Sequence, residues 1–130
     1  MTADDLTAAL RACAAGIYPL EAGVALFIAN RAFLHRQDFT SRFITVATSI
    51  GDGTTPMAAI DWDAAITALH AGELPCSGGE RRVLELSSSL AGGTLVDLND
   101  AVTGLDDGNI TRLVTAILHA SGKRPENSEY

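Results

Sequence analysis

Aliphatic side chains recur at intervals of three and four residues through most of the chain, and this spacing restricts the fold more than any other feature. Leu6, Leu10 and Cys13 form such a series, and a wider one comprises Ile110, Leu113, Val114, Ile117 and Leu118. In a helix these spacings place the side chains on one face. Aromatic residues are only 5% of the chain, which also favours helices over a sheet sandwich. We therefore expect an all-α fold, a single compact bundle of six to seven short helices.

Three helices are predicted in an N-terminal half, residues 1–50. The first covers residues 3–15, begins at Thr2 and ends at Gly16, and its apolar face continues to Ile17. The second begins near Pro19, where proline suits the first turn, and continues to about His35. Asp38 is predicted to cap the third. The apolar face of the second helix comprises Val24, Phe27, Ile28 and Leu34, and that of the third comprises Phe39, Phe43, Val46 and Ile50.

A loop at residues 51–59 is predicted to separate this half from a C-terminal half, residues 60–122. The loop contains GDGTTP at 51–56, a composition typical of turns. Four helices are predicted to begin in the second half at the caps Asp61, Ser77, Asp97 and Asp106. The last helix has the widest apolar face and ends at Gly122, so we place it in the centre of the core. Residues 123–130 are predicted to form a flexible polar tail.

The charge balance limits the classes of partner. Sixteen acidic and nine basic residues give a formal charge of −7, and this charge disfavours binding to nucleic acid or to anionic lipid. The first ten residues lack the features of a secretory signal, and the apolar stretch at 17–34 is interrupted by polar residues. We therefore expect a cytoplasmic protein with no membrane span. Cys13 and Cys76 have no metal-type spacing and are predicted to be reduced thiols.

One segment suits anion binding. Ser77 and Glu80 have the spacing of a capping box, so a helix is predicted to start there. Gly78 and Gly79 would leave its backbone N–H groups accessible, and Arg81 and Arg82 would add positive charge. The alternative interpretation is a structural helix cap with arginines that pair with Glu80 or Glu85.

Other candidate residues carry weaker signals. Arg31, His35, Arg36 and Arg42 could form a basic edge between the second and third helices. His35, His70 and His119 lie near predicted helix ends, where a cation is favourable. Cys76 precedes a helix start, which could activate a thiolate, but the sequence identifies no base for it. We predict no catalytic residues, no cofactor and no metal ligands.

Two segments resemble a known group of proteins. The stretch from DWDAAITALHAGELPCSGGERRVLELSSSL to LVTAILHASG, within residues 61–122, is similar to a family of small uncharacterised actinobacterial proteins, and so is ACAAGIYPLEAGVALFIAN at 12–30. The family has no assigned activity. The resemblance implies a bacterial cytoplasmic protein and no particular catalytic residues.

These observations leave two hypotheses of different classes. The first is a non-enzymatic helical protein-interaction or regulatory module, which binds a protein partner or associates with itself as a homodimer. The alternative is a small ligand- or anion-binding protein, or an enzyme, that uses the helix N-terminus at 77–82.

Overall fold

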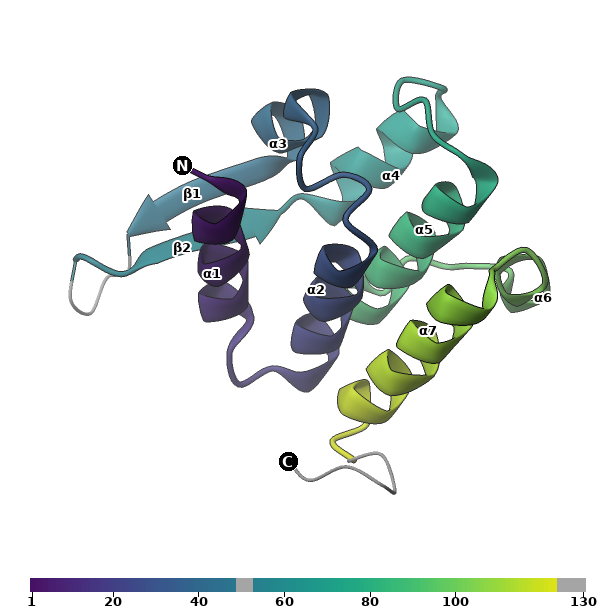
Figure 1. Cartoon of the computed structure of the whole chain (residues 1–130). Coiled ribbons are helices and arrows are strands. Elements are labelled where there is room, and N and C mark those ends of the chain that lie inside the picture. Colours follow the sequence, from purple (N-terminus) through teal and green to yellow (C-terminus); the bar gives the residue numbers. More distant parts are fainter. Residues whose placement is uncertain (49–52, 124–130) are drawn as a thin grey trace.

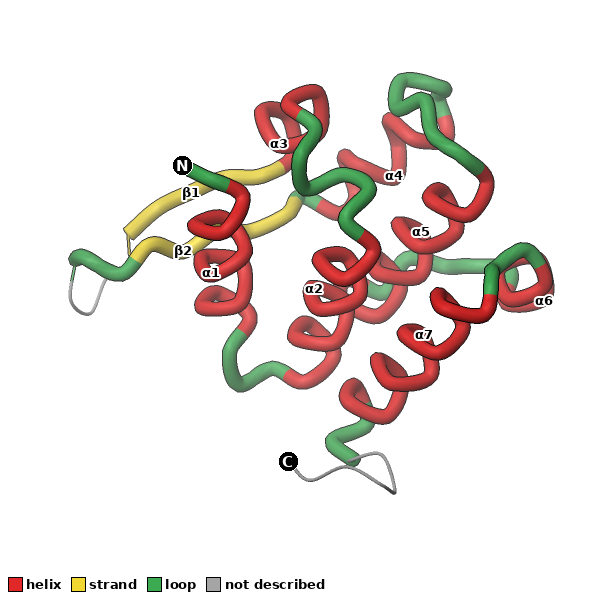
Figure 2. Tube along the Cα trace, viewed as in Figure 1, coloured by secondary structure: helices red, strands yellow, loops and turns green. Residues whose placement is uncertain are grey.

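The computed structural model describes residues 1–48 and 53–123, which contain seven helices and two strands (Figures 1 and 2). The first half comprises α1 (Ala3–Ala14), α2 (Tyr18–Asn30), α3 (Gln37–Phe43) and β1 (Ile44–Thr48). The second comprises β2 (Pro56–Ile60), α4 (Trp62–His70), α5 (Gly78–Gly92), α6 (Leu98–Thr103) and α7 (Asp107–Ala120). The predicted tail, apart from Lys123, lies outside the described residues.

Side-chain caps fix most of the helix starts. Thr2, Asp61, Ser77, Asp97 and Asp106 each accept a hydrogen bond from the backbone N–H three residues later. At Ser77 the bond is reciprocal, since Glu80 also accepts from the Ser77 N–H at 2.8 Å. These interactions satisfy N–H groups that have no partner within the helix. The predicted caps of the second half are thereby confirmed.

The all-α prediction is correct only in part, because β1 and β2 form a small antiparallel sheet. Ile44 lies opposite Ile60 and Val46 opposite Ala58, so Val46 belongs to a strand and not to the third helix as predicted. Ile50, the last residue predicted for that helix, lies outside the described residues. The predicted loop at 51–59 was too long, since β2 begins at Pro56. Four of the five residues of β1 are β-branched, which favours the extended conformation.

Two helix boundaries also differ from prediction. Helix α2 ends at Asn30 and not near His35, because Arg31 adopts a left-handed conformation with φ of 65°. Leu34 is still buried, but in the connection that follows the helix. Asp38 does not cap α3: the N-cap position is Arg36, and Asp38 lies in the first turn.

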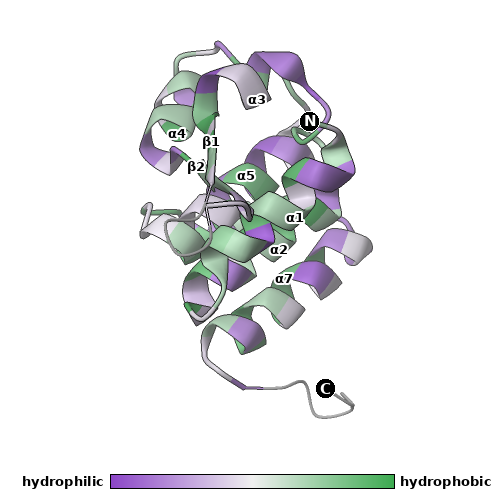
Figure 3. Cartoon of the chain, turned by 90° about the vertical axis from the view of Figure 1, so that its left-hand side faces the viewer, coloured by the Kyte–Doolittle hydropathy of each residue, from purple (hydrophilic) through white to green (hydrophobic). Residues whose placement is uncertain are grey.

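The core consists of two clusters that meet at α2. The first cluster joins α1, α3, α4 and the sheet around the fully buried ring of Phe39, which packs against Phe27, Phe33 and Phe43. The second cluster joins α2 with α5 and α7 and includes Leu26, Leu86 and Leu113. Helix α2 contributes to both, and in Figure 3 it lies between α1 and α7. Helix α2 is therefore the central helix.

The prediction that the last helix occupies the centre of the core is wrong. Leu113 is buried, but the side chains of Val114 and Ile117 are 52% and 47% exposed. Helix α7 packs mainly on α2 and less extensively on α5, and a second apolar side remains uncovered by the described residues. The prediction for Ile17 is also wrong. It was expected to continue the apolar face of the first helix, but Ile17 is 56% exposed.

Within residues 1–48 and 53–123, every helix is too short or too polar to span a bilayer.

Candidate functional site

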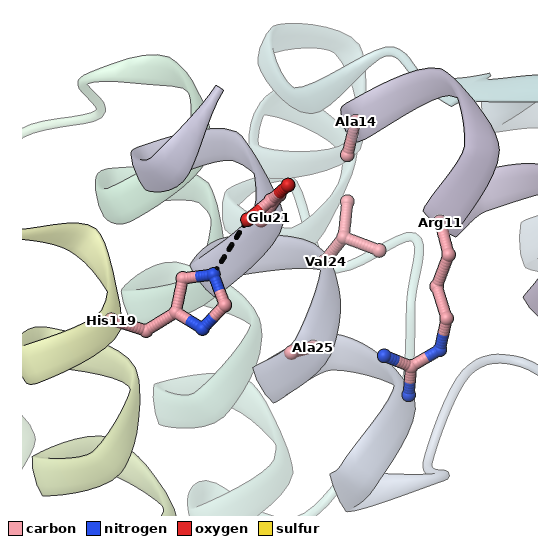
Figure 4. Close-up of a pocket in the computed structure, with 6 residues that line it drawn as sticks. All are labelled: Arg11, Ala14, Glu21, Val24, Ala25 and His119. Atoms are coloured by element: carbon pink, nitrogen blue, oxygen red, sulfur yellow. Dashed lines mark hydrogen bonds and ion pairs between the residues drawn. The ribbon is translucent and has the colours of Figure 1, made fainter. Parts of the chain in front are cut away.

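An open groove crosses the exposed side of α2, with α1 and α7 as its walls. Its first part is a hollow of about 160 Å³ between all three helices (Figure 4). Its second part, of about 210 Å³, continues between α2 and α7. Ala25 and His119 line both hollows, so the two are adjacent. The groove combines a concave surface with ionisable groups, which makes it the best candidate for a ligand site.

Small apolar side chains form most of the groove. The first hollow is lined by Ala14 of α1 and by Val24 and Ala25 of α2. In the second hollow, α2 contributes Ala22, Ala25, Leu26 and Ala29, and α7 contributes Thr111, Arg112, Thr115, Ala116 and His119. Alanine leaves space between helices that larger side chains would fill. The groove therefore results from the alanine-rich sequence of α2.

A hydrogen-bonded pair of side chains, Glu21 of α2 and His119 of α7, lies at the junction of the two hollows. The Nε2 atom of His119 is 2.7 Å from Oε1 of Glu21, and Oε2 of Glu21 accepts a hydrogen bond of 2.8 Å from the Gly16 N–H. The hydrogen bond from His119 is the main cause that lowers the pKa of Glu21, followed by the bond from Gly16. Both carboxylate oxygens are thus engaged, and Glu21 stays ionised.

The helix termini explain why this pair forms. Glu21 lies in the first turn of α2 and His119 in the last turn of α7. A carboxylate is favourable at a helix N-terminus, and a histidine, when it is protonated, is favourable at a helix C-terminus. Because the two helices pack against each other in opposite directions, these ends meet. Sequence analysis placed His119 at a helix end, but it missed Glu21, which lies 98 residues away in the chain.

Arg11 completes the first hollow from the opposite wall. It lies in the last turn of α1, and Figure 4 shows its guanidinium group across the hollow from the Glu21–His119 pair. Within the described part of the chain Arg11 makes no ion pair and no side-chain hydrogen bond. The hollow therefore has one cation whose charge is not neutralised by a neighbouring carboxylate.

The arginines of the predicted anion site bind other parts of the protein. Ser77, Gly78 and Gly79 begin α5 as expected. Arg81 pairs with Glu85 at 2.7 Å and lies 3.8 Å from an Asp100 oxygen. The Nε atom of Arg82 donates to the Asp100 carbonyl oxygen at 3.1 Å. This geometry matches the alternative interpretation of a helix cap with paired arginines, and anion binding at 77–82 stays a prediction.

The charges of two of the four residues of the predicted basic edge, Arg36 and Arg42, are compensated by acidic neighbours. Arg36 binds Asp38 through two nitrogen atoms, at 2.9 and 2.6 Å, and Arg42 binds Glu73 at 2.7 Å. The Asp38 carboxylate raises the pKa of Arg36, and Arg36 lowers that of Asp38. Arg31 and His35 are exposed.

The thiols and histidines of the described residues are not grouped into a metal centre. Cys13 and Cys76 are unpaired and half-buried. Burial raises the pKa of Cys76, and the nearby Glu80 carboxylate raises it further, so a reactive thiolate is disfavoured. Residues 1–48 and 53–123 contain no group of three or more histidine, cysteine or acidic residues arranged to hold a metal ion.

Helix α7 exposes an apolar face on the side away from the groove. Val114 and Ile117 are three residues apart and share this face with the half-buried Ile110. We refer to Ile110, Val114 and Ile117 as the outer face of α7. Leu95, which is 95% exposed, lies in a nearby connection whose Val96 packs on the same cluster as α7.

Comparisons of the sequence with protein-family models, with curated proteins and with solved structures found no match. The resemblance to small actinobacterial proteins therefore stays a prediction.

Proposed function

We propose that the chain is a non-enzymatic protein-interaction module that pairs with a second copy of itself through the outer face of α7. The exposure of Val114 and Ile117 on a helix whose opposite side is buried carries this proposal. Full burial of a large aliphatic side chain stabilises a protein by about 1.5–3 kcal/mol relative to full exposure. Val114 and Ile117 are about half exposed, so part of this free energy is still available. An apolar partner surface that covers them would provide it.

The arrangement of the outer face suits an antiparallel pair of α7 helices. Val114 lies near the middle of α7, and Ile110 and Ile117 lie on either side of it. A two-fold axis near Val114 would place Ile110 of one copy near Ile117 of the other. Such a face is complementary to itself, as a symmetric dimer requires.

The charges at the two ends of α7 favour the same orientation. Asp106 and Asp107 lie at its N-terminus, and Lys123 follows its C-terminus. In an antiparallel pair the acidic end of each helix lies beside the basic end of the other, and the helix dipoles are also opposed. These contacts offset part of the repulsion between two chains that each carry a charge of −7.

Sedimentation velocity over a wide concentration range tests the proposal. The unmodified chain should change from monomer to dimer as its concentration rises, and the double variant Val114→Gln, Ile117→Gln should remain monomeric with an unchanged helical signal. Ile17→Gln is the matched control, because Ile17 is similarly exposed but lies outside the outer face. A monomer at all concentrations, or a dimer that survives the double substitution, would contradict the proposal.

Charge exchange tests the orientation. Asp107→Lys and Lys123→Glu should each weaken the dimer, because each places like charges together across the interface. The two changes in one chain should restore it. If the double variant dimerises more weakly than both single variants, the antiparallel orientation is wrong.

A further inference from the structure

We propose that the hollow between α1, α2 and α7 is a binding site for a small monocarboxylate with a compact apolar body, such as an aryl or short-chain alkyl carboxylate. Arg11 would hold the carboxylate, and the apolar body would rest on Ala14, Val24 and Ala25. This site lies on the side of α7 opposite to the outer face, so it is independent of the proposed dimer.

The size of the hollow limits the ligand. Its volume of about 160 Å³ is close to the cavity of about 150 Å³ that takes up benzene in an engineered protein core. A single ring or a chain of a few carbon atoms therefore fills it. The adjacent hollow beyond His119 leaves room for a modest substituent.

The lining determines which part of the ligand lies where. Ala14 and Val24 are buried, and together with Ala25 they are the residues with apolar side chains that line the hollow. Water in contact with these side chains is displaced favourably by an apolar group. Arg11 lies on the opposite wall, so an apolar body on α2 directs a terminal polar group towards the guanidinium.

The polar groups favour an anion over a cation or a neutral amide. Among the residues that the structure describes, Glu21 is the one carboxylate that lines this hollow, and both of its oxygen atoms already accept hydrogen bonds from His119 and Gly16. Arg11 offers only donors and retains its full charge. A planar carboxylate matches the fork of donors on a guanidinium group, which a single hydroxyl or amide cannot do equally well.

Titration with benzoate, followed by NMR of the Ala14, Val24 and Ala25 methyl groups, tests this site. Benzoate should shift these signals in a saturable manner, and benzyl alcohol, a neutral molecule of similar size, should bind about tenfold more weakly or worse. Absence of saturable shifts up to millimolar benzoate would overturn the proposal, as would equal binding of the alcohol.

Two substitutions separate the roles of charge and space. Arg11→Gln should weaken benzoate binding about tenfold and leave the binding of benzyl alcohol unchanged. Arg42→Gln removes an exposed arginine elsewhere and should change neither. Ala25→Leu should fill the hollow and abolish both interactions. If Arg11→Gln has no larger effect on benzoate than Arg42→Gln, Arg11 does not hold the carboxylate and the site is wrong.

Discussion

The substitution Gly23→Ala tests how closely α2 packs against α5. Gly23 is buried in the middle of α2, where it faces Ser87 and Ala91 of α5. A Cβ atom at this position would lie 2.6 Å from the Ser87 carbonyl oxygen and 2.6 Å from the Ala91 Cβ atom. It would also lie 2.9 Å from the Ala91 backbone nitrogen. Two of these atoms belong to the backbone of α5, so a change of side-chain conformation cannot relieve the contact.

Two opposing effects determine how much Gly23→Ala changes the free energy of unfolding. Alanine is favoured over glycine inside a helix by about 0.8–1 kcal/mol. Overpacking of a well-packed interior costs about 1–3 kcal/mol or more, and here α2 and α5 would have to move apart. Because every contact is well below an ordinary van der Waals distance, we expect overpacking to win. Gly23→Ala should lower the free energy of unfolding by about 1–2 kcal/mol net.

Urea denaturation followed by circular dichroism measures this difference, and Gly79→Ala provides the matched control. Gly79 also lies in a helix, but a Cβ atom there would meet nothing closer than the Ser77 hydroxyl at 4.0 Å. The control should therefore be neutral or slightly stabilising. If Gly23→Ala proves as stable as the unmodified chain, α2 and α5 are not in the close contact on which both core clusters depend.

Three further predictions follow from individual side chains. Ser77→Ala should lower the free energy of unfolding by about 1 kcal/mol in urea melts, because the capping box is lost. Ser87→Ala should be neutral or stabilising, since its buried hydroxyl has no partner in the described residues, whereas Ser88→Ala should destabilise by about 1 kcal/mol. Because the pKa of Glu21 is lowered in the folded protein, its carboxylate stabilises the fold above about pH 4.5. In melts at pH 3–6 the free energy of unfolding should therefore fall on acidification, and Glu21→Gln should reduce this fall.

Local signals in the sequence predicted the helix starts well, because each depends on residues within three positions of one another. The box at Ser77 and Glu80 and the caps at Asp97 and Asp106 all form as expected. The strand β1 was missed because Phe39, Phe43 and Val46 continue a helical spacing into it. The run of β-branched residues was the signal that could have identified it.

The non-local features could not be predicted in this way. A wide apolar series on α7 shows that some of its residues are buried, but it does not show which side the neighbouring helices cover. Leu113 faces the core and Val114 does not, although both fit the helical spacing. The Glu21–His119 pair and the packing of α5 on Gly23 depend on how distant helices meet. The groove therefore appears only in three dimensions.

A symmetric disulfide tests the central claim, the antiparallel pairing of α7, most directly. Val114→Cys in a chain with Cys13→Ser and Cys76→Ser should form a covalent dimer rapidly under mild oxidation. The proposed axis brings residue 114 close to its own copy, and a disulfide requires Cα atoms within about 7 Å. Ile17→Cys in the same background has a similar exposure but lies outside the outer face, so it should form no covalent dimer at a comparable rate. Cross-linking at position 114 that is no faster than at position 17 would contradict the account.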